Sequence, residues 1–452
     1  MNQRHRAIGS PRWVGAVTGL LLLTGCREQH LLGEDRDATF PPVNGGGTGG
    51  TGMAGAGGAG GAVAPTGTGG ASDPGPPTPD GPPVVPLGGT SNGGWPIAIS
   101  PEEVARRLSS FVLQKPPSAA LTAAVVASAP RTNEDVGQLT EGLLLGDASL
   151  AGRKAFYAWW LTLDDFAKAM RDATLFPTFT PAVAAALVDE TLLFAEDITW
   201  RPEGDLTLLM TEPAAFVTSE TAPWFPGATA VPGAPPARVA LDATYYAGLL
   251  TQPAVVASHD YAERAEPSGR GMKVLDRFFC EPIPVPADPA LTPHGVVPAG
   301  QPLRQWVMTA VGNSGCGAAC HALTDPPGFA FGHFDAIGAF HDTEAGLPVD
   351  TSGIIAATGD LFDGPDLVFT GAADLARQLA ALAPVRTCFA AKWIAFSTGK
   401  ADTTPADGVT LGLDPRLDAD ADYVVKRATI QGRLDLRGTI RAVTETHSFL
   451  DP

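Results

Sequence analysis

A long segment dominated by glycine, proline, serine and threonine sets the strongest limit on how this chain can fold. It covers residues 27–97, with a glycine-rich part at 44–62 and a proline-rich part at 74–86. Such a composition cannot bury enough apolar surface to offset the entropy lost on folding. The sequence therefore predicts a disordered tether at 27–97, which as a flexible coil would span roughly 45 Å. The folded part is confined to the residues that follow.

The first 26 residues have the three-part pattern of an export signal. Three arginines precede an apolar run at 13–23, about half as long as a membrane-spanning helix, and the run ends in LTGC at 23–26. Small residues before Cys26 resemble the lipobox of bacterial lipoproteins, which implies cleavage before Cys26 and lipidation of its thiol. Arg27 stands where an aspartate would favour inner-membrane retention, so the prediction is an outer-membrane lipoprotein of the cell envelope. The alternative is an ordinary secretory signal in which Cys26 has no role.

Charge and cysteine content limit the partners and the compartment. Removal of the signal leaves 27 basic and 48 acidic side chains. Such a surface repels phosphate backbones, so nucleic acid is not expected as a partner. Besides Cys26 there are four cysteines, and in an oxidising compartment they should form disulfides, thioethers or both.

Apolar periodicity predicts a mainly α-helical fold. The sequence SPEE at 100–103 is a capping box with proline at the first helical position, and it should start a helix. Apolar residues then recur at three- and four-residue steps over 156–170, 183–198, 303–310, 375–382 and 385–396. The second of these segments follows a helix cap at Thr180-Pro181, and the last is closed by Gly399. Strand-like alternation is short and scattered. We therefore expect multi-helix domains with long Pro/Gly-rich connections, and aromatic stripes that belong to the core.

One short motif carries the chemistry that the sequence suggests. Cys316 and Cys320 are followed directly by His321, as in c-type haem attachment, where two cysteines form thioethers and the next histidine binds the iron. The usual motif has two residues between the cysteines, and here there are three. A disulfide interpretation is equally simple, with Cys316 and Cys320 bonded to Cys280 and Cys388. A zinc site is weaker, because no second paired cluster supplies four ligands.

The residues after this motif resemble a known family. DPPGFAF at 325–331, FDAIG at 334–338 and GLPVDTSG at 346–353 are similar to the bacterial domain-of-unknown-function family 1588. Upstream, three segments are similar to family 1592: FYAWWL from residue 156, LFPTF from residue 175 and DET from residue 189. The region from Cys388 to Lys400 is similar to family 1585. The resemblance implies modules at 98–235 (family 1592), 236–355 (family 1588) and 370–452 (family 1585). Relatives are usually exported and often carry cytochrome-like domains.

The chain departs from the family pattern at one further place. Where members commonly have Glu-Asn-Phe-Asp, this sequence has Gly-His-Phe-Asp, which introduces His333. His333 lies twelve residues after His321, so the two are candidate iron ligands on opposite sides of a haem. Met308 and His341 are rival candidates for the second ligand.

The pairing of Cys280 and Cys388 depends on what Cys316 and Cys320 form. If Cys316 and Cys320 hold a haem c, Cys280 and Cys388 are the only remaining pair and should form a disulfide. Without haem, three pairings of the four thiols remain open. A further polar group, His259 and Asp260 with nearby arginines, lacks a nucleophile motif, and we expect a structural role for it.

The leading hypothesis is a lipid-anchored electron carrier with one covalent haem, acting on an unknown redox partner. Its rival is a disulfide-stabilised binding or scaffold module at the cell surface, with no redox centre. A third hypothesis, an enzyme that performs a haem-assisted oxidation, requires a substrate pocket.

Overall fold

The structure is a computed structural model that describes residues 94–283, 297–311, 315–359, 361–399 and 415–451. The predicted export signal, Cys26 and residues 27–93 of the predicted tether lie outside these residues. The last four tether residues do not match the prediction, because they belong to the folded part. Trp95 stacks on His447 with ring centroids 4.0 Å apart, and the backbone of Ile97 bonds to Arg131 at 3.0 Å. The folded part therefore begins four residues before the predicted end of the tether.

The first helix of the folded part is the one that the capping box predicts. Ser100 accepts a hydrogen bond from the N–H of Glu103, and α2 covers Pro101–Leu108. A π-helical turn, Ser109–Leu113, continues it. Helices α3 (Ala119–Ser128) and α4 (Asn133–Leu144) follow, and α4 starts with a complete capping box between Thr132 and Asp135.

The periodic segment at 156–170 forms two helices and not one. Helix α5 covers Leu150–Trp160 and α6 covers Leu163–Lys168. Thr162 between them has a φ of 55°, a left-handed conformation that interrupts the helical hydrogen bonds. Met170 lies beyond α6 and is 86% exposed, so it is not a core residue. The three- and four-residue spacing of apolar residues continues across this break, so the periodicity does not reveal it.

The middle of the chain contains the longest helix and a two-stranded sheet. Helix α7 (Pro181–Trp200) starts at Thr180, whose hydroxyl accepts from the N–H of Val183, as predicted. It is followed by α8 (Leu206–Thr211), the antiparallel strands β1 (Ala214–Val217) and β2 (Ala237–Ala240), and the short helix α9 (Pro253–Val256).

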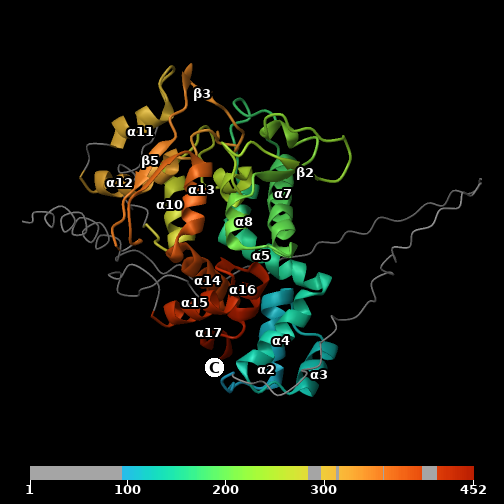
Figure 1. The fold of residues 1–452 in the computed structure, drawn as a ribbon. Coiled ribbons are helices and arrows are strands. Elements are labelled where there is room, and N and C mark those ends of the chain that lie inside the picture. The colour runs from blue at the N-terminus through green and yellow to red at the C-terminus, as the bar shows by residue number, and fades with distance from the viewer. Residues whose placement is uncertain (1–93, 284–296, 312–314, 360, 400–414, 452) are drawn as a thin grey trace, which may run out of the picture. The chain divides into compact units, whose positions relative to one another are not determined.

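Helices α10 (Pro267–Phe279), α11 (Leu303–Val311) and α12 (Gly315–Phe329) carry the cysteine and histidine motif and its surroundings. The strand pairs β3–β4 (Thr343–Glu344, Leu347–Pro348) and β5–β6 (Ser352–Ile355, Leu367–Thr370) are antiparallel. α12 packs along α10 and against β5, and α11 lies beside α12 (Figure 1).

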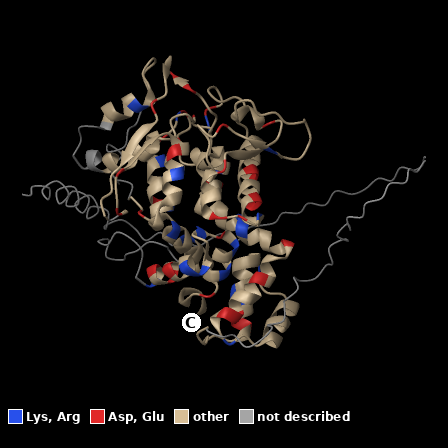
Figure 2. Cartoon of the chain, viewed as in Figure 1, with Lys and Arg blue, Asp and Glu red and all other residues tan. Residues whose placement is uncertain are grey.

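The C-terminal part is again helical. It contains α13 (Ala372–Ala381), α14 (Ala383–Thr398), α15 (Pro415–Ala428), α16 (Leu436–Val443) and α17 (His447–Leu450), with the small pair β7–β8 (Thr429–Ile430, Arg433–Leu434). Gly399 closes α14 with a φ of 65°, as predicted. α15 packs against both α14 and α16. Acidic and basic residues are interspersed among the helices (Figure 2).

One buried apolar cluster connects these parts and confirms the mainly α-helical prediction. It extends from Val104 to Leu450, and the aromatic stripes of α5 and α7 are in it. Phe156 of α5 stacks on Trp393 of α14, with ring centroids 3.4 Å apart. Strands in the described residues form only four two-stranded sheets.

Candidate functional site

Helix α12 forms one wall of a groove, which we call the His321 groove. It has a volume of about 580 Å³ and lies between α11, α12 and the β5–β6 pair. Side chains from all of these elements contribute to its lining, among them Met308, His321, Asp325, Ile354 and Val368. One of the three predicted haem residues, His321, therefore faces a hollow of the molecule.

His321 is held by a carboxylate. Its Nδ1 lies 2.8 Å from Oδ1 of Asp325, one helical turn further along α12, and Ser268 of α10 donates to the same oxygen at 2.7 Å. A carboxylate only accepts, so Nδ1 carries the proton and donates it. The lone pair of a neutral imidazole is then on Nε2. This is the arrangement that orients metal-binding histidines and makes them more basic.

The same three residues do not form a hydrolytic triad. In such a triad the serine and the carboxylate contact opposite nitrogens of the imidazole. Here the Oγ of Ser268 lies 3.1 Å from His321 Nδ1, the nitrogen that also meets Asp325. The cluster is therefore suited to orient His321 and not to activate Ser268.

Large apolar side chains are exposed around the groove. Met308 is 56% exposed, Ile354 53% and Val368 61%. The described residues include ten exposed large apolar side chains, and three of them line this one groove. A concentration of exposed apolar surface in a concave place is typical of a ligand-binding site.

The two motif cysteines lie on α12, before the histidine. Cys320 is partly exposed and is not among the described side chains that line the groove. Cys316 lies in the first turn of α12, but its side chain is outside the described part of the structure. The structure therefore places both cysteines on the helix that carries His321 and leaves their attachment chemistry untested.

The structure separates the candidates for a second iron ligand. Met308 lines the groove together with His321. His333 lies elsewhere: its Nδ1 donates to the carbonyl of His341 at 2.9 Å, and its ring stacks on Phe340. His341 lines a different cavity. Among the described lining of the groove, Met308 and His321 are the only side chains of the kinds that commonly bind haem iron.

Two glycines explain how α12 is positioned. A Cβ at Gly271 of α10 would lie 1.7 Å from the carbonyl oxygen of Thr324, and one at Gly328 would lie 1.7 Å from that of Pro267. Only glycine allows such an approach of backbone to backbone. The Arg-Gly and Pro-Pro-Gly motifs of the sequence therefore bring α10 and α12 into close contact, and Ser268 into reach of His321.

A buried ion pair fixes the loop after α12. Arg270 binds Asp260 through two hydrogen bonds, of 2.5 and 3.0 Å, and donates to the backbone carbonyls of Phe331, Phe334 and Asp335. Both side chains are buried. As expected from the sequence, the group around Asp260 has a structural role, since these partners leave Arg270 little capacity for other contacts.

The outer cysteines form a disulfide. Cys280 at the end of α10 is bonded to Cys388 of α14, with Cα atoms 5.4 Å apart. The pairing joins the helix beside the motif to the core, and it excludes the interpretation in which Cys280 or Cys388 is bonded to Cys316 or Cys320.

A buried lysine lies below α9. The Nζ of Lys273 contacts the carbonyl of Val255 and the hydroxyl of Ser258, and Ser258 also meets His259 Nδ1 at 3.0 Å. Burial lowers the pKa of Lys273 to about 7 and that of His259 to about 3, because water no longer solvates their charged forms. Neither the His321 groove nor the larger cavity beside it is lined by Lys273, Ser258 or His259.

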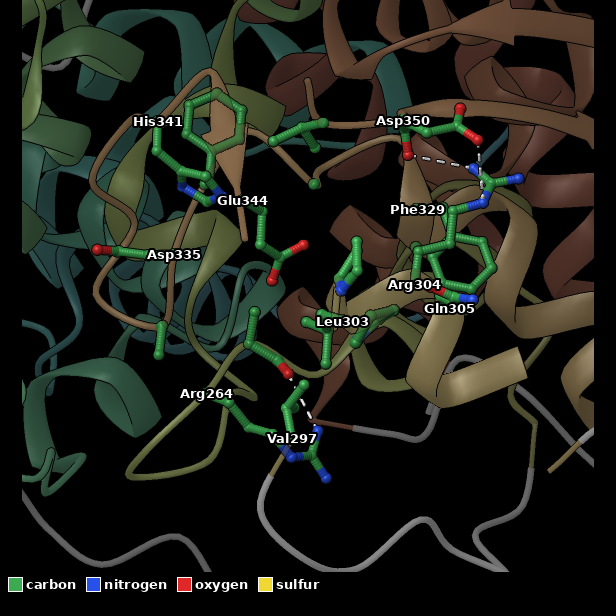
Figure 3. A pocket seen from close by; sticks show the side chains of 18 of the residues that line it. Arg264, Val297, Leu303, Arg304, Gln305, Phe329, Asp335, His341, Glu344 and Asp350 are labelled. Atoms are coloured by element: carbon green, nitrogen blue, oxygen red, sulfur yellow. Dashed lines mark hydrogen bonds and ion pairs between the residues drawn. The ribbon is translucent and has the colours of Figure 1, made fainter. Parts of the chain in front are cut away.

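A larger hollow, which we call the Glu344 cavity, adjoins the groove. It has a volume of about 1180 Å³, and Arg304, Met308 and Phe329 line both hollows. Glu344 of β3 reaches into it between His341 and Leu303 (Figure 3). Sequence reasoning missed this cavity, since its lining comes from segments between 172 and 350 that share no motif.

In the described residues, no group of three or more His, Cys, Asp or Glu side chains is arranged to hold a metal ion. In the same part of the chain, no single helix has the length and apolar character for a membrane span, although the pair α13 and α14, bent by 84°, meets these criteria jointly.

Comparison with known proteins gave two family matches. Residues 99–225 match PSD4, described as a protein of unknown function (DUF1592), and residues 246–344 match PSCyt3, described as a protein of unknown function (DUF1588). No curated protein and no solved structure matches the chain. The second match includes α10, α11, α12 and Glu344.

Proposed function

Residues 99–225 and 246–344 of this chain match the DUF1592 and DUF1588 families, and we propose that the chain is a lipid-anchored protein of the cell envelope that carries one c-type haem and passes electrons. The observation that carries the proposal is His321. Its Nδ1 is held by Asp325, and it stands at an apolar groove on the helix that also holds Cys316 and Cys320.

The histidine and the apolar surface that a haem c needs line the groove, and the two motif cysteines lie on the same helix. Haem c needs two thiols, a histidine directly after the second thiol, and an apolar surface against the porphyrin. Cys316 and Cys320 would supply the thioethers, and Nε2 of His321 would bind the iron. Ile354 and Val368 supply exposed apolar surface that a porphyrin would cover. The bound group would contribute a one-electron iron couple.

The chain's own residues would tune that couple. The hydrogen bond to Asp325 makes His321 a more basic ligand, which favours the oxidised iron. Ser268 donates to the carboxylate and so moderates its charge. Arg304 stacks over Phe329 at 4.5 Å between the groove and the Glu344 cavity, and its fixed positive charge would act in the opposite direction, towards the reduced iron.

The disulfide supports export. Disulfides form and persist in oxidising compartments such as the periplasm and the cell surface, and Cys280 and Cys388 are both buried in the core. Covalent haem attachment also takes place on exported chains. We therefore propose that Cys26 carries the lipid and that residues 27–93 separate the folded part from the membrane.

A second candidate is a disulfide-stabilised binding module without a redox centre. The observation that favours it is the Glu344 cavity, because it is larger than the groove and its described lining contains no cysteine and not His321. Such a module would bind its ligand there whether or not a haem is attached.

The experiment that separates the two candidates is haem staining after denaturing electrophoresis. The mature chain would be produced in a bacterial host with a c-type haem maturation system, together with the Cys316→Ser, Cys320→Ser and double variants. We expect covalent haem in the wild type, none in the double variant, and full retention in His333→Ala, whose side chain lies outside the groove. Absence of stain from a folded wild-type protein would leave the binding module as the function.

A further inference from the structure

The Glu344 cavity has the size and composition of a binding site for a small organic molecule. Its volume of about 1180 Å³ slightly exceeds the range of ~300–1000 Å³ that is usual for such sites. It is formed by the loop before α10, by α11, by the end of α12 and by the β3–β4 pair (Figure 3). It lies beside the His321 groove, but nothing in its lining requires a haem.

The charges in the lining disfavour an anionic ligand. Three arginines and five carboxylates line the cavity. Each arginine already has a carboxylate partner: Arg264 binds Glu266 at 2.8 Å, Arg270 binds Asp260, and Arg304 lies 3.5 Å from Asp350. The guanidinium of Arg264 is also enclosed between the rings of Tyr261 and Trp306. The positive charges are therefore neutralised, and the excess charge of the cavity is negative.

Glu344 is the carboxylate best placed to meet a ligand. It is half-buried, its carboxylate extends into the middle of the cavity (Figure 3), and it receives a hydrogen bond from the N–H of Leu303. No basic side chain of the described residues forms an ion pair with it. Burial raises the pKa of Glu344, since its negative charge is poorly compensated. A cation from a ligand would supply the missing charge.

The remaining surface of the cavity is apolar. Phe176 is a partly exposed aromatic side chain of the lining, and Leu175 and Leu347 are exposed large apolar side chains there. Such surface binds the apolar part of a ligand, and an aromatic ring attracts a cation over its face.

From these observations we propose that the Glu344 cavity binds an organic ammonium compound, with the ammonium group at the carboxylate of Glu344 and an apolar or aromatic body against Leu175, Phe176 and Leu347. The ligand is distinguished by charge and shape. A neutral molecule of the same shape would lose the ion pair, and a carboxylate would be repelled.

The test uses three probes of one shape and different charge: benzylammonium, benzyl alcohol and benzoate. Isothermal titration of the full mature chain at pH 7 should show one benzylammonium bound per chain. Benzyl alcohol should bind about tenfold or more weakly, equivalent to ~1.4 kcal/mol, and benzoate should not bind measurably. Equal affinities for the three probes, or no binding of benzylammonium, would overturn the proposal.

Variants locate the binding. Glu344→Gln should weaken benzylammonium about tenfold and leave benzyl alcohol unchanged. Gln305 is an exposed residue of the same lining, so its substitution does not threaten the fold. Gln305→Glu should therefore strengthen benzylammonium binding, and Gln305→Lys should weaken it. Benzylammonium binding that responds to none of these changes would place the ligand elsewhere and contradict the assignment.

Discussion

The Nδ1 atom of His321 lies 2.8 Å from Oδ1 of Asp325, so the histidine of the cysteine motif is fixed by a carboxylate on its own helix. Both the spacing of residues along α12 and the packing of α10 against it contribute to this contact. The spacing of four residues places both side chains on one face of α12, and the close packing of α10 adds Ser268 to the same carboxylate. The protein thus fixes the ring orientation and the tautomer of the proposed axial ligand.

Asp325→Asn should move the reduction potential of the proposed haem to a more positive value. The amide is a weaker acceptor than the carboxylate, so His321 becomes less basic and stabilises the oxidised iron less. Ser268→Ala is the matched control, because it removes the neighbouring hydroxyl and leaves the carboxylate in place. Its potential should change far less. Potentiometric titration followed in the visible spectrum measures both, and a potential that is unchanged or lower in Asp325→Asn would contradict this role.

Removal of the disulfide should destabilise the fold by about 2–5 kcal/mol. The bond between Cys280 and Cys388 closes a loop with a sequence separation of 108, and its loss leaves the unfolded chain much freer. Guanidinium unfolding of the Cys280→Ala/Cys388→Ala variant measures the loss. Reductant should bring the wild type close to the variant and should not affect the variant. A variant as stable as the oxidised wild type would show that the bond contributes nothing.

The free energy of unfolding should rise with pH between 7 and 10. Lys273 has a folded pKa of about 7 and an ordinary value of 10.5, so between these values the unfolded state binds a proton that the folded state does not. One such group gives a slope of up to about 1.4 kcal/mol per pH unit. Below pH 7 the amine of Lys273 is protonated in both the folded and the unfolded state, so the folded state bears the full free-energy cost of burying the charge.

Lys273→Met should reduce that slope, since methionine has a similar length and no titrating group. Lys168→Met changes an exposed lysine and serves as the control. Urea unfolding at pH 7.5, 8.5 and 9.5 compares the three proteins. The same pH slope in the wild type and in Lys273→Met would show that the buried amine is not responsible.

Cys26→Ser should release the protein from the membrane fraction. The lipid on Cys26 is the proposed anchor, and the substitution removes the acylated thiol. Fractionation and mass measurement of the mature chain would show the loss of membrane attachment and of the lipid mass together. Persistent membrane attachment with an unchanged mass would assign the anchor to another part of the chain.

The sequence predicted the fold well where local patterns determine it. Ser100 and Thr180 mark helix starts and Gly399 a helix end, because capping is a local hydrogen-bonding requirement. Thr162 was missed because a left-handed threonine carries no local signal. Trp95 falls in the predicted tether because the residues around it have the composition of a linker. Its stacking partner His447 is more than 350 residues away, so no local pattern indicates the contact.

The candidate site was only partly predictable, for a similar reason. His321 was visible from its motif, and Asp325 could have been found from its spacing of four residues on one helix. Ser268 reaches the site only through the packing of α10 on α12, and Glu344 only through the position of the β3–β4 pair. Periodicity does not encode such contacts between distant segments.

The pyridine haemochrome spectrum of the purified mature chain tests the central proposal most directly. The protein would be produced with a haem maturation system, and the spectrum would be recorded before and after acid-acetone extraction. The account predicts a haem c spectrum, with one haem per chain that stays with the protein after extraction and is absent from the Cys316→Ser/Cys320→Ser variant. A folded wild-type protein without a haem band, or with haem that is fully extracted, would contradict it.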